Sequence, residues 1–153
     1  MSAEFKIIPE AVIAASPEDK PAILKALADV FARAYSRDAT EVLESLQERE
    51  QLGSTGFGRG VAIPHARIEG LARPMAACLR LNQPVDFDAA DGMPVDLVFG
   101  LISPAEGGTA HLHALAAISR LLRDEAMHEA LTEAPDEEAL RGLLTNISDR
   151  DAA

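Results

Sequence analysis

Residues 95–102 read Val95-Asp96-Leu97-Val98-Phe99-Gly100-Leu101-Ile102, a nearly continuous apolar run. Eight residues suit a β-strand, and a strand that is apolar at successive positions is buried on both sides. Such a strand belongs to a sheet that other elements cover on both faces. The run therefore predicts an internal strand of an α/β protein.

The segments on either side of this run have the patterns of further strands and helices. Three of them have the alternation or composition of strands: residues 12–15, 61–63 and 75–82. Five have the apolar spacing of helices: residues 16–35, 38–50, 109–122, 124–133 and 136–144. The first residue of the first helix stays open, because Ser16 and Asp19 both resemble a helix start while Pro21 lacks a backbone N–H.

This order of elements predicts an α/β fold: a single-domain sandwich with a small central mixed sheet flanked by helices. The chain has 153 residues, the size of one compact domain, and shows no internal repeat or linker. We expect one domain over residues 1–153 with an ordered core over about residues 8–147. Residues 1–11 and 148–153 are expected to be frayed or bound to the surface.

Composition excludes several classes of protein. One cysteine, Cys78, rules out an internal disulfide and favours a reducing compartment, and its apolar surroundings predict a packed thiol. A formal net charge of -11 argues against nucleic-acid binding and against binding to an anionic membrane surface. Neither a signal peptide nor an apolar run long enough to cross a bilayer is apparent, so we expect a cytoplasmic protein without membrane insertion.

His65 is the first candidate for chemistry, in the sequence Gly60-Val61-Ala62-Ile63-Pro64-His65-Ala66. Pro64 fixes its own φ and keeps Ile63 extended, so the backbone of His65 leaves the end of a strand in a defined direction. The alternative is a histidine that only ends a strand.

Arg49 and a glycine-rich loop are the next candidates. Arg49 shares a helix face with Val42 and Leu46, where a guanidinium needs an anion or a route to solvent; reaching solvent near the helix end is the simpler explanation. The loop at residues 53–60 has four glycines, whose backbone N–H groups could approach a phosphate, and Ser54, Thr55 and Gly56 are its candidate contacts. It matches neither the P-loop nor the dinucleotide-binding pattern, and a flexible hairpin-like loop is the alternative.

His111 falls in the first turn of a helix that Thr109 can cap and whose apolar face is expected to carry Leu112, Leu115, Ile118 and Leu122. The positive end of the helix dipole favours a neutral imidazole, which can donate one hydrogen bond to an anion. His113 points elsewhere, because positions i and i+2 do not share a helix face. No cysteine or carboxylate at ligand spacing completes a metal set, and His128 suits an ordinary surface position.

Together these residues suit phosphoryl transfer, which depends mainly on positioning and on stabilising the charge of three oxygens. His65 would attack, while His111, Arg49 and the loop amides would stabilise the transferred group. The sequence shows no carboxylate cluster for Mg²⁺ and no nucleotide fingerprint. We therefore expect no cofactor and a phosphoprotein as the donor.

Two motifs resemble one known family. The first motif consists of Glu50, six further residues, Phe57-Gly58, two further residues and residues 61–66. It resembles the phosphorylation-site signature of type-2 IIA domains. These are the fructose/mannitol-class proteins of the bacterial phosphoenolpyruvate-dependent phosphotransferase system. Residues 94–101 followed by residues 109–113 are similar to its nitrogen-regulatory branch.

The resemblance implies a role for each candidate. It implies that His65 accepts phosphate from a small histidine phosphocarrier protein, itself charged through an enzyme I that uses phosphoenolpyruvate. It implies that His111 lies beside His65, that Arg49 lies near the phosphoryl group, and that Ser54 and Thr55 belong to the usual Ser-Thr-Gly loop. Members of the regulatory branch bind target proteins according to their phosphorylation state.

Three alternatives remain open. A sugar-specific IIA protein that passes phosphate to a IIB domain would have the same site. A non-catalytic binding module would carry an idle histidine. A metal-binding hydrolase would contain stoichiometric zinc.

Overall fold

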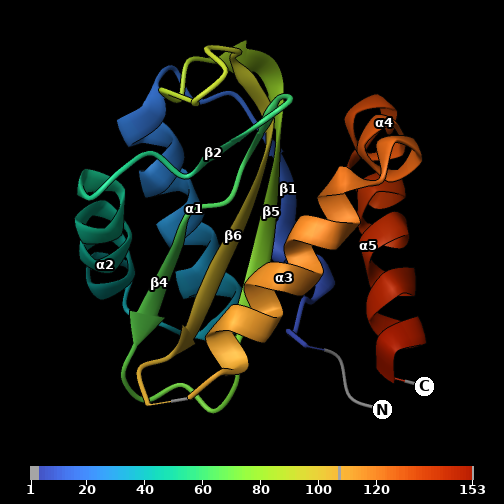
Figure 1. Ribbon diagram of the computed structural model, residues 1–153. Coiled ribbons are helices and arrows are strands. Elements are labelled where there is room, and N and C mark those ends of the chain that lie inside the picture. The colour runs from blue at the N-terminus through green and yellow to red at the C-terminus, as the bar shows by residue number, and fades with distance from the viewer. Residues whose placement is uncertain (1–3, 107, 153) are drawn as a thin grey trace.

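The computed structural model describes residues 4–106 and 108–152, which form three layers with a mixed sheet between two groups of helices (Figure 1). The strands are β1 (Val12–Ala15), β2 (Gly56–Gly58), β3 (Val61–Ala62), β4 (His65–Ile68), β5 (Met75–Val85) and β6 (Val95–Pro104). The helices are the 3-10 helix η1 (Pro9–Ala11), α1 (Lys20–Tyr35), α2 (Ala39–Gln51), α3 (Ala110–Arg123), α4 (Glu125–Glu133) and α5 (Glu137–Ala152). The predicted α/β sandwich with a mixed central sheet is confirmed.

The sheet has the order β1-β5-β6-β3-β2, and β4 also pairs with β6. β1 is parallel to β5, β5 is antiparallel to β6, and both β3 and β4 run parallel to β6. Helices α1 and α2 cover one face, while α3, α4 and α5 cover the other (Figure 1).

β6 is buried on both sides, as its continuous apolar sequence predicts. Val98 and Ile102 belong to the core under α1 and α2, whereas Leu97, Phe99 and Leu101 belong to the core under α3, α4 and α5. The helices on the two faces thus bury alternate residues of one strand, and this fixes both layers relative to it.

Capping residues determine where the first two helices begin. The Asp19 carboxylate accepts from the N–H of Ala22, and Pro21 lies in the first turn, where a missing N–H costs no helix bond. The Asp38 carboxylate accepts from the N–H groups of Thr40 and Glu41 at the start of α2. The first residue of this helix, which the sequence left open, is therefore Lys20.

The strand expected to end at Pro64 ends at Ala62, and a further strand follows Pro64 on the same neighbour. Val61 and Ala62 pair with β6 at Leu97 and Val98, and after a break at residues 63–64 the chain pairs with β6 again from His65 to Ile68. Pro64 lacks an N–H but its carbonyl accepts from Leu101, so the chain stays on the same neighbour. His65 therefore follows a short strand, as expected, and also begins a second one, β4, which the sequence did not predict.

The glycine-rich loop is also more ordered than expected. Residues 56–58 form β2, antiparallel to β3, so only part of residues 53–60 is a loop. The positive φ values of Gly58 and Gly60 permit the tight turn between these strands.

The two chain ends differ from the prediction as well. Phe5 and Ile7 are buried, and the Tyr35 hydroxyl donates to the carbonyl of Ala76 and accepts from the N–H of Ile8. Residues 4–11 are therefore part of the packed structure and not frayed. Helix α5 continues to Ala152, eight residues past the predicted end, while residues 1–3 and 153 lie outside the described residues.

Cys78 is fully buried, as predicted, and burial raises the pKa of its thiol to about 12. Among the described residues, no helix has the length and apolar character that crossing a membrane requires.

Candidate functional site

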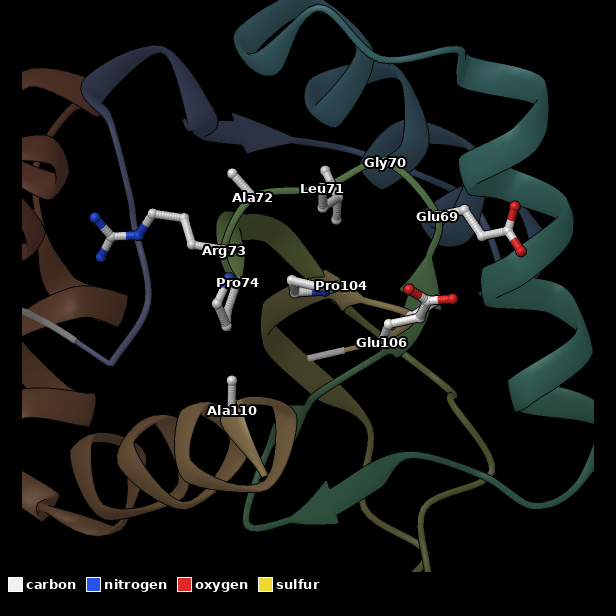
Figure 2. Close-up of a pocket in the computed structure, with 10 residues that line it drawn as sticks. Glu69, Gly70, Leu71, Ala72, Arg73, Pro74, Pro104, Glu106 and Ala110 are labelled. Carbon is white, nitrogen blue, oxygen red and sulfur yellow. The ribbon is translucent and has the colours of Figure 1, made fainter. Parts of the chain in front are cut away.

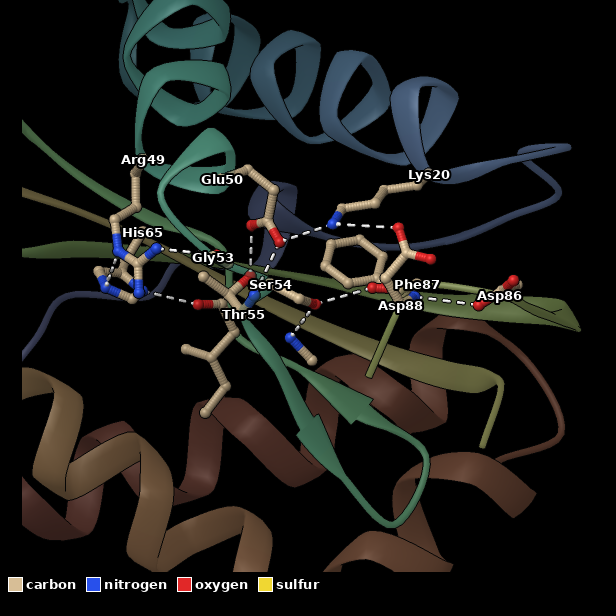
Figure 3. A network of polar contacts seen from close by, with 12 residues as sticks. Lys20, Arg49, Glu50, Gly53, Ser54, Thr55, His65, Asp86, Phe87 and Asp88 are labelled. Atoms are coloured by element: carbon tan, nitrogen blue, oxygen red, sulfur yellow. Dashed lines mark hydrogen bonds and ion pairs between the residues drawn. The ribbon is translucent and has the colours of Figure 1, made fainter. Parts of the chain in front are cut away.

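Three predicted residues from different elements meet at one end of α2. Arg49 lies in the last turn of α2, His65 is the first residue of β4, and His111 lies in the first turn of α3. The Nε of Arg49 lies 3.2 Å from the Nε2 of His65 (Figure 3), and the ring centroids of His65 and His111 are 5.5 Å apart. The structure therefore brings all three together.

Two partners determine the tautomer of His65. Its Nδ1 lies 2.8 Å from the carbonyl oxygen of Ile63, which can only accept, so Nδ1 carries the proton. Its Nε2 faces the Nε–H of Arg49, which can only donate, so Nε2 carries the lone pair. The available nucleophile is therefore Nε2.

Both imidazoles favour the neutral form. Burial lowers the pKa of His65, an effect that the Ile63 hydrogen bond opposes and the Arg49 charge reinforces. Burial also lowers the pKa of His111 to about 4, with further lowering by His65 and Arg67. A neutral His65 keeps its lone pair, and a neutral His111 has one N–H to donate.

These shifts predict a pH dependence of stability. An unfolded histidine binds its proton near pH 6.5, whereas folded His111 does so only near pH 4, so the unfolded state holds more protons between these values. We expect the free energy of unfolding to fall as pH drops from 7 to 4.5, and to fall less in His111→Gln. Urea denaturation followed by circular dichroism measures this, with His113→Gln, which alters an exposed histidine of the same helix, as the control. An unchanged slope in His111→Gln would contradict the assignment.

Two hollows flank the Arg49–His65 pair. One has a volume of about 300 Å³ and is lined by residues 54–57 with Ile63, Leu115 and Ser119 as well as the pair itself. The other, of about 380 Å³, lies on the side of Arg67 and His111. A group bonded to Nε2 therefore has space beside a guanidinium.

Ser54 and Thr55 line the first hollow, but their hydroxyls bond to the protein. Ser54 Oγ donates to the carbonyl of Phe87 at 2.8 Å and accepts from the N–H of Gly56 at 3.0 Å. Thr55 Oγ1 donates to Glu50 Oε1 at 2.6 Å. A phosphate contact from either hydroxyl stays a prediction, and it would have to replace one of these bonds.

Gly56 has no room for a side chain. A Cβ at this position would lie 2.7 Å from the Cα and Cβ of Ala89, closer than carbon atoms pack. We expect Gly56→Ala to lower stability by about 1–3 kcal/mol, because the backbone of Ala89 must move. Thermal unfolding measures this, and Gly53→Ala, where the space is open, controls for glycine removal although its φ of 157° adds strain of its own. An equally stable Gly56→Ala protein would show that the loop shifts freely.

Two of the lining residues that were missed from the sequence could have been identified by their spacing. Ser119 lies eight residues after His111, close to the same face of α3. Arg67 lies two residues after His65, on the same side of β4.

Helix α3 and His128 correct three expectations. Leu112 was expected to face the core, but it is 59% exposed, while His111 is 6% exposed. Thr109 occupies the N-cap position, yet its side chain makes no capping bond to the residues that the structure describes. His128 is half-buried, 3.6 Å from the carboxylate of Asp96, and is not an ordinary surface residue.

A separate hollow of about 830 Å³ lies at residues 69–74, 104–106 and Ala110 (Figure 2). It shares no lining residue with the two hollows beside His65. In the described part of the chain, no group of three or more His, Cys, Asp or Glu side chains could hold a metal ion.

The arrangement suits acceptance of a phosphoryl group. It combines a neutral nucleophilic nitrogen, a guanidinium beside it and a second neutral imidazole within reach of the same space. Phosphoryl transfer needs such donors around the oxygens and needs no strong base for an imidazole nucleophile.

Comparison with known proteins agrees with this chemistry. The family described as "Phosphoenolpyruvate-dependent sugar phosphotransferase system, EIIA 2" matches residues 6–147. The nitrogen regulatory protein of Pseudomonas aeruginosa is 43% identical over 129 residues, 84% of each chain. A fructose-specific EIIA component of Haloferax volcanii is 39% identical over 115 residues, 75% of this chain and 73% of that protein.

The fold comparison points the same way. The crystal structure of the nitrogen regulatory protein IIA-Ntr from Neisseria meningitidis superposes with a TM-score of 0.82 at 33% identity, covering 90% of this chain and 95% of that one. The sequence signature, the fold and the match over most of the chain agree. This chain therefore belongs to the EIIA type 2 family of the phosphoenolpyruvate-dependent sugar phosphotransferase system.

Proposed function

We propose that the chain is a phosphohistidine carrier of the nitrogen-related branch, in which Nε2 of His65 accepts the phosphoryl group. The observation that carries the proposal is the bonding of the ring: Nδ1 donates to the carbonyl of Ile63, and Nε2 faces Arg49 and the flanking hollows. Only one nitrogen is then free to form a bond to phosphorus.

In the reaction one N–P bond forms at His65 and one N–P bond breaks on the donor. The Nε2 lone pair attacks the phosphorus of a phosphohistidine on the donor, the donor's N–P bond breaks, and its electron pair returns to the donor imidazole. His65 keeps the proton on Nδ1, so its ring becomes positive, and the Ile63 carbonyl stabilises that charge. Arg49 moves its hydrogen bond from Nε2 to a phosphoryl oxygen, and neutral His111 donates to another.

Membership of the family supports a proposal for the partners. We propose that a histidine phosphocarrier protein is the donor, that the phosphorylation state of His65 controls binding to target proteins, and that the protein acts in the cytoplasm. Similarity to nitrogen regulatory proteins over most of both chains supports the regulatory role. No nucleotide or metal takes part in the proposed transfer.

Labelling tests the carrier function. The chain is incubated with enzyme I, the phosphocarrier protein and radioactive phosphoenolpyruvate, and we expect one phosphate per chain, stable to base and labile to acid. Omitting the phosphocarrier protein should abolish labelling. A chain that stays unlabelled would be the non-catalytic binding module, and the proposal would fail.

The second candidate is a sugar-specific IIA component, which the similarity to the fructose-specific relative favours. The two functions differ in the fate of the phosphate. The labelled chain is mixed with a fructose-type IIB domain, and we expect the regulatory protein to retain its phosphate. Rapid loss to IIB would assign the transport function instead.

A further inference from the structure

Glu50 is a buried carboxylate that makes no hydrogen bond with His65 among the described residues, although its charge opposes the lowering of the pKa of His65. Its side chain is 5% exposed, and its Oε2 lies 3.0 Å from the Nζ of Lys20, which is itself mostly buried. A buried charge is costly unless it is paired and hydrogen-bonded. The groups that bond to Glu50 therefore indicate which part of the structure its buried charge stabilises.

Hydrogen bonds link Glu50 to the imidazole of His65 through the backbones of Thr55 and Ile63, and Figure 3 shows the bonds from Glu50 to Thr55. Glu50 accepts from Thr55 twice, at 2.7 Å from the backbone N–H and at 2.6 Å from Oγ1. The Thr55 carbonyl accepts from the N–H of Ile63 at 3.0 Å, and the Ile63 carbonyl accepts from Nδ1 of His65 at 2.8 Å. The position of Thr55 thus determines where the acceptor for Nδ1 lies.

The backbone of the same loop also holds Arg49, without the carboxylate of Glu50. The backbone carbonyl of Glu50 accepts from the N–H of Gly53 at 3.2 Å, and the Gly53 carbonyl accepts from Nη1 of Arg49 at 2.9 Å. The loop between α2 and β2 therefore orients both the histidine ring and the guanidinium. Ser54 fixes the other side of this loop through its bond to the carbonyl of Phe87.

We propose that Glu50, held by Lys20, is a positioning residue for phosphoryl transfer, and that the hydroxyl of Thr55 serves this bond and not the phosphate. The inference rests on the proposed function, because it assigns a role in the acceptance of phosphate by His65. Glu50 fixes Thr55, Thr55 fixes Ile63, and Ile63 keeps the proton of His65 on Nδ1.

The two carboxylate oxygens explain which substitutions the site tolerates. Alanine removes both acceptors, so the N–H and hydroxyl of Thr55 and the ammonium of Lys20 lose their partner. Glutamine keeps the shape: its oxygen can replace Oε2, and its NH₂ can donate to Thr55 Oγ1, which then accepts. Glu50→Gln is therefore the conservative variant that should rescue the geometry without the charge.

The experiment compares phosphorylation rates and the tautomer of His65 in four variants: Glu50→Ala, Glu50→Gln, Thr55→Val and the double variant Glu50→Ala/Thr55→Val. Phosphorylation uses limiting phosphocarrier protein, at a temperature where circular dichroism shows each variant folded. Imidazole ¹⁵N chemical shifts report which ring nitrogen carries the proton in the unphosphorylated chain. Glu44→Ala, which alters an exposed glutamate of the same helix, is the matched control.

We expect Glu50→Ala to accept phosphate about 10- to 100-fold more slowly, since a displaced nucleophile loses its reactive geometry. Its His65 should show a mixture of tautomers, while Glu50→Gln recovers most of the rate and the Nδ1–H form. Thr55→Val should be slow as well, and the double variant no slower than Glu50→Ala, because both changes break the same bond.

Three results would overturn the inference. Glu50→Ala could unfold at a lower temperature yet, when folded, retain the wild-type rate and tautomer, and Glu50 would then only stabilise the fold. Thr55→Val could lose rate in addition to the loss in Glu50→Ala, which would indicate a separate phosphate contact. Glu50→Gln could be as slow as Glu50→Ala. Failure of the proposed function is distinguishable, because the wild-type chain itself would then stay unlabelled.

Discussion

His65→Ala is expected to accept no phosphate at all, while it keeps the fold of the wild-type chain. The substitution removes the only nucleophile that the proposed transfer uses, so the labelling rate should fall to the background of the assay. The ring of His65 is partly buried and makes two hydrogen bonds, so we expect a loss of stability of about 1–2 kcal/mol. Acid-labile phosphate after incubation with the phosphotransferase components is the measurement.

His113→Ala is the matched control for this variant. His113 is exposed and lies two residues after the site residue His111, so its removal tests for phosphate on an accessible histidine. We expect normal labelling of His113→Ala. Labelled His65→Ala would show that another residue is the acceptor.

Arg49→Ala should give the second largest effect. Arg49 is the cation that contacts Nε2 of His65, and its Nη1 is held by the carbonyl of Gly53. Removing one donor of this kind slows a reaction about 100- to 1,000-fold, because the developing charge on the oxygens loses its partner. Single-turnover phosphorylation by the labelled phosphocarrier protein measures the rate.

Arg49→Lys should be almost as slow as Arg49→Ala. The guanidinium contacts Nε2 through Nε and Gly53 through Nη1 at once, and a single ammonium cannot repeat that planar geometry. Circular dichroism should show both variants folded. If Arg49→Ala unfolds, Arg49 is structural; if Arg49→Lys transfers normally, only its charge matters.

The layers of the fold could be predicted because the strongest patterns belong to buried elements. The continuous apolar sequence of β6 already requires cover on both faces, and α1 and α2 have a clear apolar face. The N-terminal segment lacks such a pattern, because Phe5 and Ile7 pack as single residues beside a backbone bridge from Lys6 to Met75. Contacts of that kind depend on the assembled core.

Helix α3 departs from the apolar pattern at the turn that carries the site residue His111. Leu112 and His111 are neighbours, and hydrophobicity alone places Leu112 inside. In the structure, α3 turns His111 inward beside His65 and leaves Leu112 exposed. Apolar periodicity cannot predict this, because it ranks the histidine as a surface residue.

The candidate residues could be predicted, but their bonding could not. Arg49 and His111 were identified because each is best explained by a bound anion, and His65 because Pro64 directs its backbone at the end of a strand. The carboxylate of Glu50 was missed as a bonding partner, since a glutamate near the end of a polar helix is ordinarily exposed, and its burial depends on Lys20 and Thr55 reaching it from other segments. The same bonds change the interpretation of the Thr55 hydroxyl.

The proposed role of His65 is tested most directly by identifying the nitrogen atom to which phosphorus is bonded. The chain, labelled with ¹⁵N at its histidines, is phosphorylated through the phosphocarrier protein, and ³¹P–¹⁵N coupling is recorded by NMR. We predict a single phosphohistidine, at His65, with phosphorus bonded to Nε2 and the proton still on Nδ1. Phosphorus on Nδ1, or on any other residue, would contradict the assignment that the Ile63 and Arg49 contacts support.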